Sequence, residues 1–252
     1  MCTTLTTNHK VAQTTSALTV GLAQLAPIKC NISENLTKHI ELVKQAAKKQ
    51  VELLIFPELS LTGYEPEISA DFAITYGSHP IRVLHNLANK HSMTILVGTP
   101  LRIKNTAPEL GLVVLSPDAP IRHYSKIHLH GIENEFFSAG KEQMLLSMKG
   151  FSIGLAICAD TTHPEHIQHA VNAGADCYLA SLLISEQGYS ADATMFMKYA
   201  QQHNIVVGIS NFVGQSGPYT CAGKSTFWNT NGEVVAQAND VHETVITTTL
   251  SK

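Results

Sequence analysis

The sequence predicts a layered α/β protein with mixed β-sheets, and three features of the chain support this fold class. Strand-like segments alternate with segments of helical periodicity through the middle of the chain, which is typical of helices that cover a sheet. The strands of this region, such as 51–56 and 151–157, are continuously apolar, as expected for strands buried on both faces. Both flanks contain closely spaced short strands, which favours hairpins. Periodicity alone does not decide whether the strands form one sheet or two.

The first half of the chain is predicted to contain strands, two helices and one hairpin. In order, these elements are a strand at 18–25, a helix at 33–50, a strand at 51–56, a helix at 81–91, and strands at 94–98, 112–115 and 121–124. Ser33 suits the N-cap of the first helix, and apolar residues recur on one face of that helix. The segment 116–119 has the composition of a β-turn, so the strands on either side of it are expected to pair.

The second half continues the alternation and then ends in strands. Its elements are a strand at 151–157, a helix at 164–172, a strand at 176–180, a helix at 191–203, and strands at 205–210, 224–228, 234–238 and 244–249. Pro164 suits the first position of its helix, and Gly174 follows the end of that helix. No repeat or linker interrupts these elements. Residues 17–252 are therefore predicted to form a single domain after a polar N-terminal tail at 1–16.

The composition excludes several classes of protein. Of the 252 residues, 44% are hydrophobic and 15% are charged, and the formal net charge is −3. This excludes a disordered chain, which needs low hydrophobicity and high net charge. It also argues against nucleic acid as a partner, since such proteins carry a basic excess. No apolar run approaches the roughly 20 residues that span a bilayer, and the N-terminal segment lacks the apolar centre of a signal peptide. We therefore expect a cytoplasmic protein that binds neither membranes nor nucleic acid.

The cysteines and histidines first suggest a metal site. The chain has 5 Cys and 13 His, but no two cysteines form a C-x-x-C pair, so a thiolate zinc site is not expected. His163, His166 and His169 recur every three residues, which makes a metal enzyme one alternative. Successive steps of three residues drift around a helix by about 60°, so these side chains do not share one face. No metal and no cofactor is predicted.

Three polar residues each follow a predicted strand. Glu58 comes after the strand 51–56, Lys126 after 121–124, and Cys158 after 151–157. In layered α/β proteins, ligands bind just beyond the carboxyl ends of strands. A carboxylate, an ammonium and a thiol at that position could serve as base, electrophile and nucleophile. Taken singly, each has an ordinary interpretation, as a turn residue, a surface lysine and a small core residue.

The sequence after Cys158 favours a reactive thiol. Pro164 begins a helix, with Thr162 or His163 as its N-cap. The positive end of the helix dipole and a nearby cation both stabilise a thiolate. We therefore expect the pKa of Cys158 to lie below its ordinary value. The backbone N–H of Ala159 and the ammonium of Lys126 could then hold a developing oxyanion.

These segments resemble the nitrilase superfamily of carbon–nitrogen hydrolases. Four segments carry the resemblance: Phe-Pro-Glu-Leu with Leu-Thr-Gly-Tyr at 56–64, Tyr-Ser-Lys-Ile-His-Leu at 124–129, Cys-Ala-Asp with Pro-Glu at 158–165, and Gly-Lys-Ser at 223–225. The resemblance runs from about 18 to 250. It implies a four-layer αββα sandwich of two mixed sheets flanked by helices, and a homodimer or larger homo-oligomer. It also implies a catalytic triad of Glu58, Lys126 and Cys158, together with a second glutamate, for which Glu133 matches better than Glu135.

The resemblance implies hydrolysis of a small amide or N-carbamoyl compound through a thioester on Cys158. Glu58 would act as general base and Lys126 would stabilise the oxyanion. Ala159 and His163 stand where the family commonly has aromatic residues, which leaves the shape of the pocket open. The candidate substrate-binding residues are Tyr64, Phe136, Ala159, Leu183, Ile184 and Glu186. Two alternatives remain on the same fold: nitrile hydrolysis by the same triad, and a binding or regulatory protein without catalysis.

Overall fold

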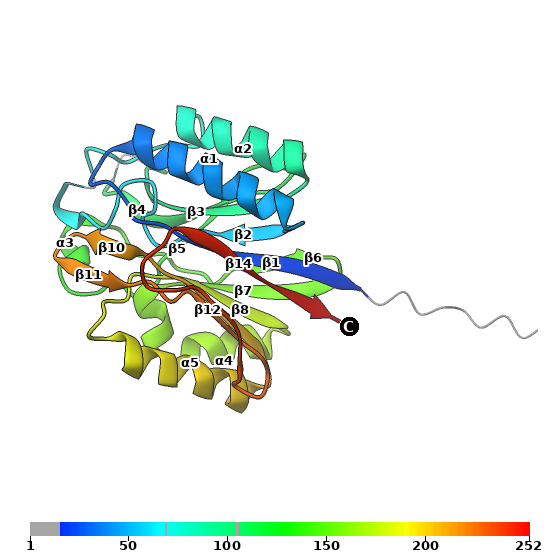
Figure 1. The fold of residues 1–252 in the computed structure, drawn as a ribbon. Coiled ribbons are helices and arrows are strands. Elements are labelled where there is room, and N and C mark those ends of the chain that lie inside the picture. The colour runs from blue at the N-terminus through cyan, green and yellow to red at the C-terminus, as the bar shows by residue number, and fades with distance from the viewer. Residues whose placement is uncertain (1–15, 69, 104–105) are drawn as a thin grey trace, which may run out of the picture.

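The computed structural model describes residues 16–68, 70–103 and 106–252. The predicted tail at 1–16 therefore lies outside the described residues, apart from Ser16. The described strands form two six-stranded sheets and a two-stranded ribbon. The sheets lie face to face, and a pair of helices covers the outer face of each (Figure 1). The prediction of a four-layer αββα sandwich with mixed sheets is confirmed.

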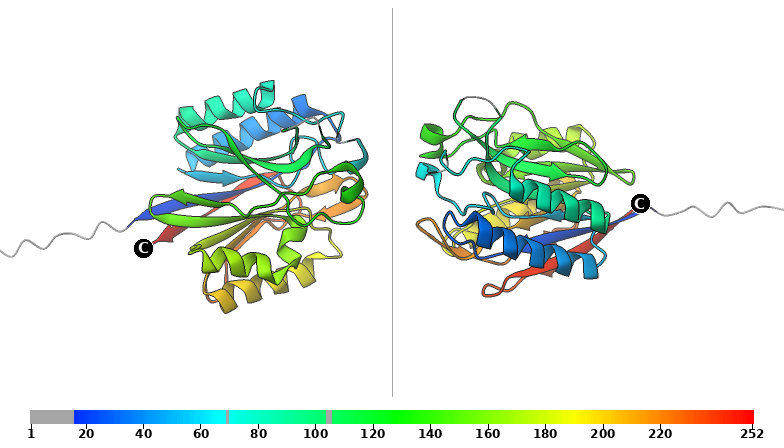
Figure 2. Two further views of the ribbon diagram at one scale, coloured as in Figure 1. Left: turned by 180° about the vertical axis from the view of Figure 1, so that it is seen from behind. Right: turned by 90° about the horizontal axis from the view of Figure 1, so that it is seen from above.

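The first sheet contains most of the N-terminal half and the last strand of the chain. Its strands, in spatial order, are β14 (Thr244–Ser251), β1 (Ala17–Gln24), β2 (Leu53–Ile55), β3 (Thr94–Leu101), β4 (Glu109–Leu115) and β5 (Arg122–Ser125). Strands β1, β2 and β3 run parallel, and the others pair antiparallel. The helices α1 (Ile32–Lys48) and α2 (His79–His91) supply the connections between the parallel strands. They lie next to each other over the sheet, as the view from above shows (Figure 2).

The second sheet repeats this plan with the C-terminal half of the chain. Its strands, in spatial order, are β13 (Val234–Gln237), β12 (Thr226–Trp228), β9 (Val206–Ser210), β8 (Cys177–Ser181), β7 (Phe151–Ile157) and β6 (Leu145–Met148). Here β7, β8 and β9 run parallel. The helices α4 (Pro164–Asn172) and α5 (Tyr189–His203) connect them. The ends of β2 and β7 that carry Glu58 and Cys158 thus belong to different sheets.

Three apolar layers hold these elements together. Leucine, isoleucine and valine side chains of both sheets fill the space between the sheets. A second cluster packs α1 and α2 on the first sheet, and a third packs α4 and α5 on the second. Burial of apolar area on both faces of the central strands stabilises the fold by roughly 25 cal/mol per Å². This explains why the central strands are apolar without interruption.

Several local features differ from the sequence predictions. Helix α1 begins at Ile32 with Asn31, not Ser33, as its N-cap. The Asn31 side chain accepts a hydrogen bond from the Glu34 backbone N–H at 3.1 Å and donates to the Glu34 carboxylate at 2.9 Å. Strand β6 and the ribbon of β10 (Val213–Ser216) and β11 (Tyr219–Ala222) were not predicted. Their four-residue strands are too short to establish a period. Among the described helices, none combines the length and the apolar character needed to cross a membrane.

Candidate active site

Glu58 lies in a tight turn directly after β2, held between the two sheets. The hydroxyl of Ser181, at the end of β8, donates a hydrogen bond to the Phe56 carbonyl at 2.8 Å. On the other side, Gly98 of β3 packs so closely that a Cβ atom there would lie 2.3 Å from the Pro57 carbonyl oxygen. Only glycine leaves room for this approach. The position of the Glu58 backbone is therefore fixed by the sheets themselves.

Helix α1 supports the same turn with two buried polar side chains. The Asn35 amide donates a hydrogen bond to the Leu61 carbonyl at 3.0 Å. The His39 ring lies between the Asn35 carbonyl, 2.7 Å from Nδ1, and the Ser60 hydroxyl, 2.9 Å from Nε2. Burial lowers the pKa of His39 to about 4, so this imidazole is neutral and structural. Residues 58–62 are thus anchored to α1 as well as to the sheets.

Cys158 follows β7 without an intervening loop. Its φ is +41°, a left-handed conformation that is rare outside glycine and is typical of constrained functional turns. The residue begins a short 3₁₀ helix, η2 (Cys158–Thr162), which precedes α4. Its sulfur lies 3.9 Å from the Leu183 carbonyl oxygen. In such a helix the first N–H groups have no partner within the helix, and Ala159 supplies one of them.

The predicted lowering of the Cys158 pKa is wrong. Burial and the negative charge of Glu58 raise the pKa of this thiol well above its ordinary value, and Lys126 offsets this only in part. The prediction was based on the helix dipole and a nearby cation, but η2 separates Cys158 from the start of α4, and the cation does not outweigh burial and Glu58. The resting group is therefore a thiol beside a carboxylate, and its proton must leave as it reacts.

Asp160 connects the cysteine turn to the lysine turn. One of its carboxylate oxygens accepts hydrogen bonds from the backbone N–H groups of Ile127, at 3.1 Å, and His128, at 2.9 Å. The other oxygen accepts from the Tyr124 hydroxyl at 2.6 Å and from the Ile157 N–H at 3.0 Å. This side chain has no exposed surface. Its four hydrogen bonds hold the segments of Lys126 and Cys158 next to each other.

Lys126 lies between two glutamates in the interior. Its ammonium donates to Glu58 Oε1 and to Glu133 Oε1, at 2.8 Å in each case. Glu133 in turn accepts hydrogen bonds from the Tyr64 hydroxyl and the His130 backbone N–H, each at 2.8 Å. Burial alone would lower the pKa of Lys126, but the neighbouring acidic groups outweigh it and the pKa is raised. The lysine is therefore charged. Glu135, the weaker candidate for the second glutamate, is exposed.

Glu58 is only half satisfied by its surroundings. Its Oε2 is the one buried side-chain nitrogen or oxygen atom in the described part of the chain without a hydrogen-bond partner. Burial raises the pKa of Glu58 to about 7, with a contribution from Glu133, although Lys126 acts in the opposite direction. A carboxyl group with this pKa can both take and return a proton near neutral pH.

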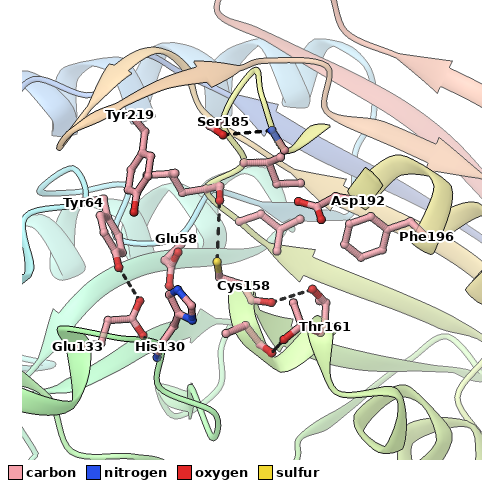
Figure 3. Close-up of a pocket in the computed structure, with 16 residues that line it drawn as sticks. Glu58, Tyr64, His130, Glu133, Cys158, Thr161, Ser185, Asp192, Phe196 and Tyr219 are labelled. Atoms are coloured by element: carbon pink, nitrogen blue, oxygen red, sulfur yellow. Dashed lines mark hydrogen bonds between the residues drawn. The ribbon is translucent and has the colours of Figure 1, made fainter. Parts of the chain in front are cut away.

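A cavity of about 220 Å³ opens over Glu58 and Cys158 (Figure 3). Four of the predicted substrate-binding residues line it: Tyr64, Ala159, Leu183 and Ile184. Tyr64, His130 and Tyr219 also line a second cavity of about 460 Å³, so the two cavities adjoin.

Two predicted pocket residues lie elsewhere. Phe136, in the short helix α3 (Glu133–Phe136), packs at the edge of the core between the sheets. Glu186 is exposed and does not line this cavity, and its backbone N–H donates to the Thr220 carbonyl. Both predictions came from the distance along the chain to a motif, which does not give the direction of a side chain.

Several residues of the cavity wall were not predicted. Among them are His130, Asp192, Phe196 and Tyr219. Asp192 and Phe196 share a face of α5 because they are four residues apart, and a helical reading of 191–203 could have placed them together. Tyr219 belongs to the unpredicted ribbon, so the sequence contained no comparable signal for it.

One group of potential metal ligands occurs among the described residues. Ligand atoms of His128, His163 and Glu165 lie within 4.8 Å of one another. The two imidazole rings are stacked, with centroids 3.8 Å apart and planes 15° apart. Nearly parallel rings do not direct their nitrogen lone pairs at one tetrahedral centre. His166 bonds instead to the hydroxyls of Tyr124 and Tyr178, and His169 is exposed.

Comparison with known proteins identifies the family. A family model described as carbon–nitrogen hydrolase matches residues 19–252. The chain belongs to the carbon–nitrogen hydrolase family. This confirms the resemblance drawn from the glutamate, lysine and cysteine segments, and the prediction of a carbon–nitrogen hydrolase at the level of the family.

Individual relatives of this carbon–nitrogen hydrolase are distant in sequence. A probable nitrilase of Schizosaccharomyces pombe is 26% identical over 240 residues, which are 92% of this chain and 88% of that protein. A glutamine-dependent NAD(+) synthetase of Thermotoga maritima is also 26% identical, but the chain spans only 42% of its length. A mutant of the Nesterenkonia AN1 amidase, from the nitrilase superfamily, has the same fold. Its TM-score is 0.84 at 20% identity, covering 93% of this chain and 91% of that one.

Proposed function

We propose that the protein hydrolyses the carbon–nitrogen bond of small amides or N-carbamoyl compounds through a thioester on Cys158. One observation carries the proposal. Glu58 lines the cavity with Cys158 and has a buried oxygen that no described residue satisfies. Leaving a buried carboxylate oxygen unpaired is unfavourable, so such an atom indicates a group that exchanges protons during a reaction. A purely structural glutamate would have both oxygens paired.

Each residue then has a role in the first half of the reaction. Glu58 takes the thiol proton while the Cys158 sulfur attacks the carbonyl carbon. The resulting oxyanion accepts hydrogen bonds from the Ala159 N–H and the Lys126 ammonium. An ammonium has three donors, of which Glu58 and Glu133 use two, so one remains. Glu58 returns the proton to the nitrogen, the carbon–nitrogen bond breaks, and ammonia or an amine leaves.

The second half uses the same carboxylate. Glu58 takes a proton from water, the hydroxide attacks the thioester, and the proton passes to the departing sulfur. Glu133 is a positioning residue in this scheme, because it holds the Lys126 ammonium and is itself held by Tyr64. A glutamate-to-leucine mutant of the Nesterenkonia amidase, which shares the fold, is described with the acetamide moiety of fluoroacetamide added covalently at its active-site cysteine. This supports a nucleophilic role for the cysteine.

Release of ammonia from a panel of small amides, carbamoyl compounds and nitriles tests the proposal. We expect turnover of at least one amide or carbamoyl compound by the wild-type protein and none by Cys158→Ala. Cys30→Ala is the matched control, since Cys30 is a half-buried thiol outside the cavity and also has a positive φ. Intact mass spectrometry should find an acyl adduct on Cys158. Turnover of nitriles alone, or equal activity of Cys158→Ala, would contradict the proposal.

The cellular location, the cofactor requirement and the oligomeric state are also matters of proposal. We propose that the protein works in the cytoplasm without a cofactor. The family resemblance also favours a homodimer or larger assembly, which light scattering coupled to gel filtration would measure directly.

A further inference from the structure

Asp192 is a charged residue of the cavity that the proposed reaction does not use. It lies in the first turn of α5 and lines the cavity with Glu58 and Cys158. In Figure 3 its carboxylate extends from α5 into the cavity, on the side away from Tyr64 and Glu133. Among the described residues, none forms a hydrogen bond or ion pair with this carboxylate. Partial burial is the one cause that raises its pKa, so no neighbouring cation compensates its charge.

Helix stability alone does not account for this placement. An acidic side chain in the first turn of a helix interacts favourably with the helix dipole. That benefit is available to a carboxylate in solvent and does not require burial in a cavity wall. Asp192 is partly shielded from water, and a carboxylate in such a position without a neighbouring cation is less favourable than one in open solvent. A ligand in the cavity is the missing partner that the position of Asp192 suggests.

The charges around the cavity favour a cationic ligand. Lys126 is already paired with Glu58 and Glu133, and no lysine or arginine side chain lines the cavity in the part of the chain that the structure describes. When Glu58 is ionised and His130 of the cavity wall is neutral, Lys126 and the two glutamates together carry one negative charge, and Asp192 adds a second. The unsatisfied Glu58 Oε2 lies in the same cavity. A negatively charged, partly enclosed site attracts cations and repels anions.

The remaining wall is suited to a short hydrocarbon chain. Leu183, Ile184 and Phe196 line the cavity together with Asp192 and Cys158. Methylene groups could pack on these side chains while polar groups at the two ends meet Cys158 and Asp192. Because Asp192 and Cys158 line the same cavity of about 220 Å³, a chain of a few atoms is enough to reach from one to the other.

We propose that Asp192 binds a protonated amine of the substrate, so that the preferred amides carry an ammonium group a few bonds from the reacting carbonyl. This inference rests on the proposed function and names the substrate class of the same site. Asp192 is thereby a specificity residue that takes no part in bond breaking. Amides with a carboxylate at the far end should bind poorly.

Binding to the Cys158→Ala protein tests the inference without requiring turnover. The probes are two cationic amides, β-alaninamide and γ-aminobutyramide, with butyramide and valeramide as their neutral isosteres and succinamate as the anion. We expect at least one cationic amide to bind about 10- to 100-fold more tightly than its isostere, the range for one charge-assisted hydrogen bond. Dissociation constants from ligand-observed NMR titrations give this ratio within a single protein. The comparison therefore does not depend on the fraction of folded material.

Adding Asp192→Asn should reduce the cation-to-neutral ratio to near one while neutral binding changes little. Glu186→Gln is the matched control, because it removes an acidic charge from the segment before α5 but outside the cavity. An unchanged ratio in Asp192→Asn, or tighter binding of the neutral or anionic amides by the Cys158→Ala protein, would overturn the inference. Turnover of the same amides with Cys158 intact is measured separately. Turnover without charge selection contradicts only this inference, and charge selection without any turnover contradicts only the proposed function.

Discussion

Asp160 and Glu58 are both carboxylates without exposed surface, each a few residues beyond a parallel strand, one in each half of the sandwich. Asp160 accepts four hydrogen bonds from groups on three segments. Glu58 accepts one from the Lys126 ammonium, and apart from the Cys158 thiol, whose hydrogen bond lowers the pKa of Glu58, its second oxygen has no partner in the described chain. Both carboxylates lie close to the lysine turn, yet only one is satisfied.

The difference separates a structural carboxylate from a reactive one. A buried charge with all its acceptor sites filled rigidifies the groups around it, and Asp160 fixes the distance between the Lys126 and Cys158 segments. A buried carboxylate with a free oxygen remains able to accept a proton. Its pKa of about 7 keeps both protonation states accessible. Stability and reactivity are thus assigned to two neighbouring acids rather than to one.

Replacing Glu58 by glutamine should have the largest effect on activity. We expect Glu58→Gln to lose about 10³–10⁴-fold in kcat, the upper range for a general acid–base group, because the same residue serves both half-reactions. The fold should persist, since Lys126 keeps Glu133 as a partner. Steady-state kinetics with the best amide, and urea unfolding of both proteins, measure the two effects. A Glu58→Gln protein with near-normal kcat would remove the distinction between the two acids.

Replacing Asp160 by asparagine should reduce the stability of the protein more than its activity. The amide group would present N–H donors to two of the four donors that the carboxylate now satisfies. We expect a loss of about 3–5 kcal/mol in the free energy of unfolding, as for other broken buried charge networks. Denaturant titrations measure this loss. Activity per folded molecule should fall less than in Glu58→Gln, and a stable Asp160→Asn protein would mean that the four hydrogen bonds are not structurally important.

The sequence predicted the reactive residues of the site but not the structural role of Asp160. Glu58, Lys126 and Cys158 were found because each follows a strand and because the motifs around them are local. The role of Asp160 was not predicted, since three of its four hydrogen-bond partners lie more than thirty residues away along the chain. The wrong prediction of a lowered pKa for Cys158 has a similar origin. The helix-dipole argument uses only the local sequence, whereas burial and the charge of Glu58, which raise this pKa, depend on the packed fold.

Side-chain direction limited the remaining predictions. Glu186 and Phe136 lie near the motifs along the chain but do not line the cavity, whereas Asp192 enters it from α5. The packed fold explains part of the high number of histidines. His39 and His166 are buried and neutral, each with a pKa of about 4, and both hold polar groups in place beneath the site.

The pH dependence of stability tests whether the unsatisfied oxygen of Glu58 has the energetic consequence that the comparison requires. The folded protein raises the pKa of Glu58 from 4.5 to about 7, so it binds this proton more tightly than the unfolded chain does. The contribution of Glu58 to stability is therefore complete below pH 4.5 and is lost as the pH rises through about 7. The loss should be on the order of 3 kcal/mol.

Urea titrations across this range, with Glu58→Gln as the reference, isolate the contribution, because other titrating groups cancel in the difference. If the mechanism holds, kcat/KM should rise about tenfold per pH unit below the same midpoint, since only ionised Glu58 can take the thiol proton. A stability difference that does not change with pH would show that folding does not raise the pKa of Glu58.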